Sequence, residues 1–176
     1  KGINSYRTSI CLRTEMMKMM RDMNLSQSHL CRPVGAGENP NMKVVVIDPR
    51  RTASCDRADL HLALAPGADA FVFSGLLAYL SDKNHLNTDY INKHTQGFDE
   101  ALAQAKTHSL AQVAYTSGLS EEDLLTFYRW FANTQKTISF YSMGVNQSAT
   151  GTDKCNAIIN CHLATGRIGK PGMGPF

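Results

Sequence analysis

The sequence predicts an α/β fold with a largely parallel sheet. Two hydrophobic runs, KVVVID at 43–48 and TISFYSM at 137–143, are rich in the residues of fully buried strands. Segments with helical periodicity alternate with the strand-like runs along the chain. This alternation is typical of a parallel sheet with helices packed against it.

The first 38 residues predict one helix and part of a loop. Residues 14–23, TEMMKMMRDM, contain five methionines, and four of these fall on one helical face. We favour a packed helix here; a methionine-rich surface for a partner is the alternative. Residues 26–41 are rich in glycine and proline, which indicates a loop.

The middle of the chain predicts two strands and three helices. The run at 43–48 is the first strand, and alternating leucines in ADLHLAL, 58–64, predict a short second one. The segment PGADAFVFSGLLAYLSDK predicts a turn and then a helix with Asp69 as its N-cap. Two shorter helices are expected near 88–94 and 97–106.

The last third of the chain predicts helix, strand and helix. SEED at 120–123 is a capping-box pattern that opens a helix, with a buried stripe made by Leu124, Phe127, Tyr128 and Phe131. The strand at 137–143 follows. The segment TDKCNAIINCHLATG then predicts a helix that ends with Gly166 at the C′ position.

Composition excludes several classes of protein. The net charge is +3 and the basic residues are scattered, so we expect no nucleic-acid partner. No apolar run approaches the roughly 20 residues of a membrane-spanning helix, so we expect no membrane association. The five cysteines form no CxxC pair and are odd in number, which favours free thiols and a reducing compartment.

Two polar corners follow the predicted strands, where an open parallel sheet binds its ligands. After the first strand, Asp48 could accept hydrogen bonds from ribose hydroxyls, and Arg50 or Arg51 could bind phosphate. A turn aspartate with two solvated arginines is the alternative. After the later strand, Gly144 would let the backbone approach a pyrophosphate closely, although no GxGxxG pattern is present.

Three further sets of residues allow two interpretations each. Asp69 could be a helix cap, an acceptor for the amide edge of guanine, or both. Cys155, Cys161 and His162 could suggest a metal site, but no fourth ligand completes it, so we favour buried packing. The histidines at 61 and 94 have no evident triad partner, so hydrolytic catalysis is not expected.

Four motifs occur in order between residues 39 and 176: DPRRT, PG-x-D-A, MGVNQ-x-x-x-G-T-D and CHLATGRIGKPG. With the segments around them they resemble the molybdopterin oxidoreductase family, most closely its assimilatory nitrate-reducing members. The resemblance implies a three-layer nucleotide-binding domain at 39–176, partial relative to the family, that holds one molybdopterin guanine dinucleotide. Residues 1–38 lack the turn and His-Pro pair expected there and form an atypical segment.

The resemblance also implies roles for individual residues. Asp48 and Arg50 would contact the guanosine end of the dinucleotide, and Asp69 the guanine or its sugar. Met143, Gly144 and Gln147 match positions near the pyrophosphate and the pterin.

For the parent enzyme, the resemblance implies cytoplasmic reduction of nitrate to nitrite. Molybdenum would lie between two molybdopterin guanine dinucleotides, and a 4Fe-4S cluster would be present. The cysteine ligands of the cluster and the molybdenum ligand are absent here, so we expect the chain alone to be inactive and to need the remainder of the enzyme and an electron donor. A formate dehydrogenase and a stand-alone guanine-nucleotide-binding or cofactor-binding protein are the alternatives.

Overall fold

The computed structural model describes residues 8–12, as backbone, and residues 42–176. Five strands form one sheet in the order β3-β2-β1-β4-β5. They span Thr8–Leu12 (β1), Lys43–Ile47 (β2), Leu60–Leu62 (β3), Thr137–Tyr141 (β4) and Gly174–Pro175 (β5). The helix expected at 14–23 and the loop expected at 26–41 lie outside the described residues.

Four of the five strands run in one direction. β2 pairs with β3 in parallel, and β4 pairs with β5 in parallel. β1 lies between β2 and β4 and is antiparallel to both, so β2 and β4 point the same way. The α/β class and the largely parallel sheet are therefore confirmed, with β1 as an antiparallel central strand that the sequence patterns did not indicate.

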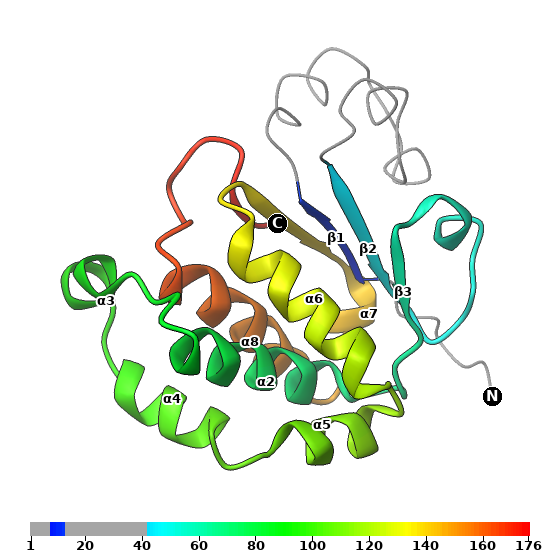
Figure 1. Ribbon diagram of the computed structural model, residues 1–176, viewed down its shortest axis with the longest axis horizontal. Coiled ribbons are helices and arrows are strands. Elements are labelled where there is room, and N and C mark those ends of the chain that lie inside the picture. Colours follow the sequence, from blue (N-terminus) through cyan, green and yellow to red (C-terminus); the bar gives the residue numbers. More distant parts are fainter. Residues whose placement is uncertain (1–7, 13–41) are drawn as a thin grey trace.

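The helices gather on one face of this sheet (Figure 1). α2 and α8 lie side by side, α6 packs beside them, and α3, α4 and α5 lie further from the strands (Figure 1). The helices span Asp69–Asp82 (α2), Thr88–His94 (α3), Phe98–Ala105 (α4), Leu110–Ser117 (α5), Glu121–Asn133 (α6), Met143–Asn146 (α7) and Gly151–Ala164 (α8). A 3-10 turn, η3, spans Cys55–Arg57.

The main hydrophobic core lies between the sheet and the helices. Alternate residues of β2, Val45 and Ile47, face the helices, whereas Val44 belongs to a smaller cluster on the other face with Met42 and Ile138. Among the described residues, helices cover only the first of these faces. The larger core also includes Leu62, Val72, Phe73, Leu76, Leu80, Leu124, Phe127, Tyr128, Phe131 and Ile158.

Most of the predicted helices are confirmed. Two further helices were not predicted, and the strand expected at 137–143 is shorter than predicted. Ser120 caps α6, as the pattern at 120–123 predicts: its side chain accepts from the Asp123 amide at 3.0 Å, while the Asp123 carboxylate accepts from the Ser120 hydroxyl and not from its amide. Gly166 has φ of 63°, the left-handed conformation expected after α8. α5 was not predicted, although Ser109 and Gln112 form a capping box at its start. α7 was not predicted either, and it ends the expected strand early, at Tyr141.

No helix within the described parts of the chain has both the length and the apolar character needed to cross a bilayer. Cys55, Cys155 and Cys161, the cysteines whose side chains the structure describes, are free thiols, as expected.

Candidate functional site

The site is built at the carboxyl ends of β2 and β4. From β2 the chain continues to β3 on one side, and from β4 it continues through α8 to β5 on the other side. Such a reversal of direction opens a crevice at the edge of an α/β sheet, where ligands bind. Here β1 separates the two strands, so their ends lie about 10 Å apart, twice the spacing of neighbouring strands.

Asp48 stands directly after β2 and is only 1% exposed. Its Oδ1 accepts a hydrogen bond from the backbone N–H of Arg50 at 2.9 Å, which closes a tight turn. Its backbone oxygen lies 2.9 Å from Nε2 of His61, on the neighbouring strand β3. Its Oδ2 is buried and has no hydrogen-bond partner among the described residues. A buried carboxylate oxygen without a donor is costly, so this atom calls for a donor from outside the described residues.

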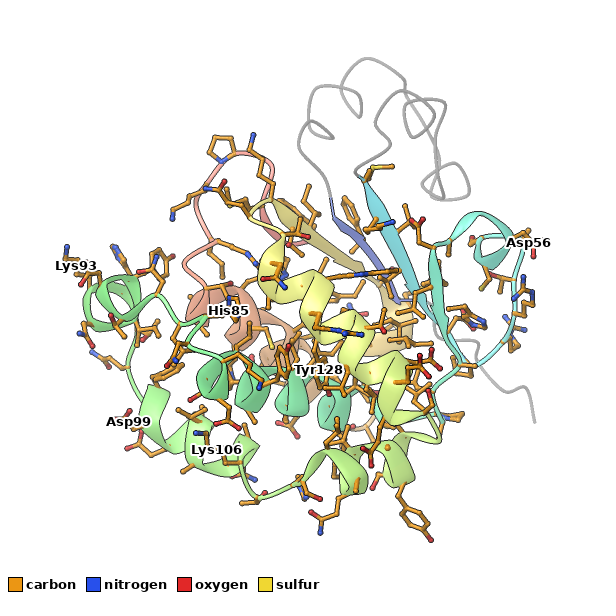
Figure 2. The ribbon with its side chains drawn as sticks, viewed as in Figure 1. Asp56, His85, Lys93, Asp99, Lys106 and Tyr128 are labelled. Carbon is orange, nitrogen blue, oxygen red and sulfur yellow. The ribbon has the colours of Figure 1, made fainter. Side chains whose placement is uncertain are left out.

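The loop that follows Asp48 exposes its basic side chains. Arg50 is exposed, whereas Arg51 pairs with Asp56 at 3.3 Å on the outside of the loop (Figure 2). The buried Cys55 thiol sits 3.4 Å from the Thr52 amide and helps to hold the turn. The structure thus leaves the Arg50 guanidinium open to solvent beside a buried carboxylate.

Asp69 is the first residue of α2 and not its N-cap. The N-cap is Ala68, and no side chain caps the helix. The Asp69 Oδ2 atom lies 3.0 Å from Nζ of Lys154 in α8, and the two side chains are 7% and 2% exposed. The predicted cap is therefore wrong, because the carboxylate turns to a buried ammonium instead of the first amides of its own helix.

The corner after β4 is the short helix α7. Met143 is 63% exposed, Gly144 is buried and Gln147 is exposed. At the start of α8, a Cβ added to Gly151 would overlap the backbone carbonyl of Asn146. Glycine at 151 therefore allows α8 to pack directly on α7, which leaves Met143 and Gln147 facing outward at the edge of the sheet.

The topology brings the six sequence-predicted residues to this one edge. Asp48 and Arg50 follow β2, and Met143, Gly144 and Gln147 follow β4. Asp69 joins them because α2 begins shortly after the carboxyl end of β3. Sequence reasoning missed Lys154, and no local pattern marks a lysine as the buried partner of an aspartate in another helix.

Cys161 and His162 belong to the core, which confirms the packing interpretation for both. His162 is fully buried with Nε2 2.7 Å from the Ser139 hydroxyl, and burial, with the nearby Arg167 charge, lowers its pKa to about 3. The Cys161 thiol donates to the Phe73 carbonyl at 3.2 Å, and burial raises its pKa. In residues 8–12 and 42–176, no three His, Cys, Asp or Glu side chains gather as a metal site.

Comparison with known proteins adds a family to this geometry. The family model described as molybdopterin oxidoreductase matches residues 13–176. A nitrate reductase from Klebsiella oxytoca is 50% identical over 139 residues, which is 79% of this chain and 16% of that protein. The assimilatory nitrate reductase catalytic subunit of Bacillus subtilis is 35% identical over 74% of this chain and 18% of that subunit.

A relative with a different name and a solved structure also match. The F420-dependent formate dehydrogenase 1 subunit alpha of Methanococcus maripaludis is 29% identical over 82% of this chain and 22% of its own length. Acetylene hydratase from Pelobacter acetylenicus shares the fold, with a TM-score of 0.61 at 22% identity, over 79% of this chain and 19% of the hydratase. The chain thus spans between 15% and 20% of the length of the first nitrate reductases that it matches.

Proposed function

Because this chain belongs to the molybdopterin oxidoreductase family, we propose that its sheet edge binds one molybdopterin guanine dinucleotide. In this proposal Asp48 and Arg50 bind the guanosine end, and Asp69 binds the guanine or its sugar. Met143, Gly144 and Gln147 lie along the pyrophosphate and the pterin. The family match supports a molybdenum–pterin cofactor, and the guanine dinucleotide and the residue roles are our proposal.

The observation that supports this site best is the buried Oδ2 of Asp48. It stands at the carboxyl end of β2, on the edge of the sheet, and has no donor among the described residues. A ribose hydroxyl or a guanine N–H would supply that donor. A turn aspartate that served only its own loop would need just the Oδ1 bond to Arg50, so the buried second oxygen favours a ligand.

The other side chains suit the rest of a dinucleotide. The exposed Arg50 guanidinium can bind a phosphate through two parallel hydrogen bonds. Gly144 has no side chain to hold a ligand away from the backbone of α7. The exposed Met143 and Gln147 offer an apolar surface and an amide beside it.

For the whole enzyme we propose the two-electron reduction of nitrate to nitrite. The 50% identical nitrate reductase from Klebsiella oxytoca supports this substrate. The bound cofactor would supply the redox chemistry, and the residues of this chain would bind and orient it. A second dinucleotide, a 4Fe-4S cluster and an electron donor would belong to the rest of that enzyme.

The proposal includes an assimilatory role and a cytoplasmic location. The relative from Bacillus subtilis supports the assimilatory role through its name. Formate oxidation is the second candidate, because a formate dehydrogenase subunit is 29% identical over 82% of this chain. Rates of the purified full-length enzyme with nitrate and with formate decide between them: nitrate turnover supports the proposal, and formate turnover without nitrate turnover overturns it.

The binding site is tested by Asp48→Asn in the full-length protein, with Asp56→Asn as the matched control in the same loop. The amide keeps an oxygen for the Arg50 bond but removes the negative charge that binds the ligand donor. A charge-assisted hydrogen bond contributes about 1.5–3 kcal/mol, so affinity should fall about 10-fold to 100-fold. We expect less GMP released per chain on acid hydrolysis of Asp48→Asn, and no change for Asp56→Asn. Equal GMP from both variants would contradict the site.

A further inference from the structure

Lys154 and Asp69 form a buried ion pair that the proposed cofactor contacts do not explain. The Lys154 Nζ lies 3.0 Å from the Asp69 Oδ2, and the side chains are 2% and 7% exposed. The pair joins the first turn of α8 to the first residue of α2. The other three ion pairs that the structure describes, such as Lys106 with Asp82, are all more exposed.

The position of Lys154 is unfavourable for its own helix. The first turn of a helix carries partial positive charge, so a lysine there is repelled and an aspartate is favoured. Burial adds the desolvation of an ammonium and of a carboxylate, and a buried pair is often no more stable than apolar side chains of the same volume. The charge of the helix end and the cost of burial therefore both disfavour a lysine at 154, and its described ion pair with Asp69 offsets them.

We propose that Lys154 is a positioning residue for base recognition: it fixes the orientation of the Asp69 carboxylate, so that this carboxylate accepts hydrogen bonds from the N–H groups of a guanine base. The inference rests on the proposed function, since it assumes that Asp69 faces the ligand. Lys154 contacts Oδ2 from the α8 side and so fixes how the carboxylate sits at the start of α2. A carboxylate accepts only, whereas adenine offers an acceptor where guanine offers N–H donors, so an Asp69 carboxylate held in one orientation would favour guanine over adenine.

The alternative is a purely structural pair that ties α2 to α8. The two roles differ in what they protect. If the pair is only a structural tie, Lys154→Met that is still folded at the assay temperature keeps its preference for GMP. If Lys154 positions Asp69, the folded Lys154→Met variant loses that preference although the Asp69 carboxylate is still present.

The experiment uses the full-length protein in its cofactor-free form, with GMP and AMP as probes in equilibrium binding. The variants are Lys154→Met, Asp69→Asn and the double variant Asp69→Asn/Lys154→Met, each with its melting temperature. Lys106→Met is the matched control, because it also removes a lysine from an ion pair. Lys106 lies on the side of the molecule away from the loop of Asp56 (Figure 2).

We expect Lys154→Met and Asp69→Asn each to weaken GMP binding about tenfold or more, while AMP binding changes less than about twofold. The double variant should regain the melting temperature lost by Lys154→Met, because no unpaired charge stays buried, but not the GMP preference. Lys106→Met should match the wild type. If Lys154→Met, or the double variant where the single one does not fold, keeps the GMP preference, the inference is overturned.

The two proposals fail in different ways. If Asp48→Asn weakens GMP binding but Asp69→Asn does not, the cofactor site stands and the role of Lys154 is overturned. If Asp69→Asn weakens GMP binding but Lys154→Met does not, Asp69 contacts the base without help from Lys154. In that case the cofactor site again stands, and only the role of Lys154 is overturned. If neither aspartate matters, the proposed site itself is wrong.

Discussion

Replacing His162 by glutamine should remove a large part of the acid sensitivity of this fold. His162 is fully buried, with its Nε2 against the Ser139 hydroxyl and its Nδ1 without a partner among the described residues. Burial, and then the charge of Arg167, lowers the pKa of His162 from 6.5 to about 3. The folded protein therefore keeps this imidazole neutral at pH values where the unfolded chain protonates it.

The sign and size of the effect follow from this difference. As pH falls below the unfolded pKa, the unfolded state binds a proton that the folded state cannot, so the free energy of unfolding falls. The loss approaches about 1.4 kcal/mol per pH unit and continues until the folded pKa is reached. Between about pH 6 and pH 4.5 it amounts to roughly 2 kcal/mol from His162 alone.

Urea unfolding at about pH 6 and pH 4.5 measures this, with the fluorescence of Trp130, the single tryptophan, as the signal. The glutamine variant should be less stable than the wild type at both pH values, because the site is tightly packed. Its stability should nevertheless fall about 2 kcal/mol less between them. All other ionisable groups are the same in the two proteins and cancel in the comparison. Parallel pH dependences in the two proteins would refute a neutral, buried His162.

Three further substitutions test the packing. A Cβ at Gly75 would lie 2.5 Å from the Tyr128 hydroxyl, so Gly75→Ala should lower the free energy of unfolding in urea by about 1–3 kcal/mol. Adding Tyr128→Phe to the same chain should recover part of this loss, and no recovery would contradict the contact. Gly151→Ala forces α8 away from the Asn146 carbonyl, so the melting temperature and the GMP content should both fall, and an unchanged GMP content would show that the α7 corner does not bind ligand. Lys106→Met removes a largely exposed ion pair and should change the free energy of unfolding by less than about 1 kcal/mol; a larger loss would mean that the pair is buried in solution.

The sequence predicts those elements whose signals are local. The hydrophobic run at 43–47 is typical of a buried strand. Ser120 and Asp123, which are three residues apart in the sequence, mark the start of α6. The edge with Asp48 and Gly144 follows from the same reasoning, because ligand sites in α/β sheets lie where the strands end.

The sequence does not predict features that depend on residues far apart. Asp69 reads as a helix cap because its partner, Lys154, comes from a different helix. β1 lies among residues without a distinct strand pattern and is defined by its pairing with β2 and β4. Local periodicity contains no information about such pairings, so structure was needed to find them.

The place of β1 in the sheet has a consequence for how the chain folds. This strand must pair with β4, which is synthesised more than a hundred residues later. Closing so long a loop is slow, and until it closes β1 presents one edge without its neighbour. β2 pairs with β3 and β4 pairs with β5 over shorter stretches of chain, and β1 joins these two pairs. The two halves of the ligand edge would therefore come together in a late folding step, and delay at that step would leave a half-built sheet prone to aggregation.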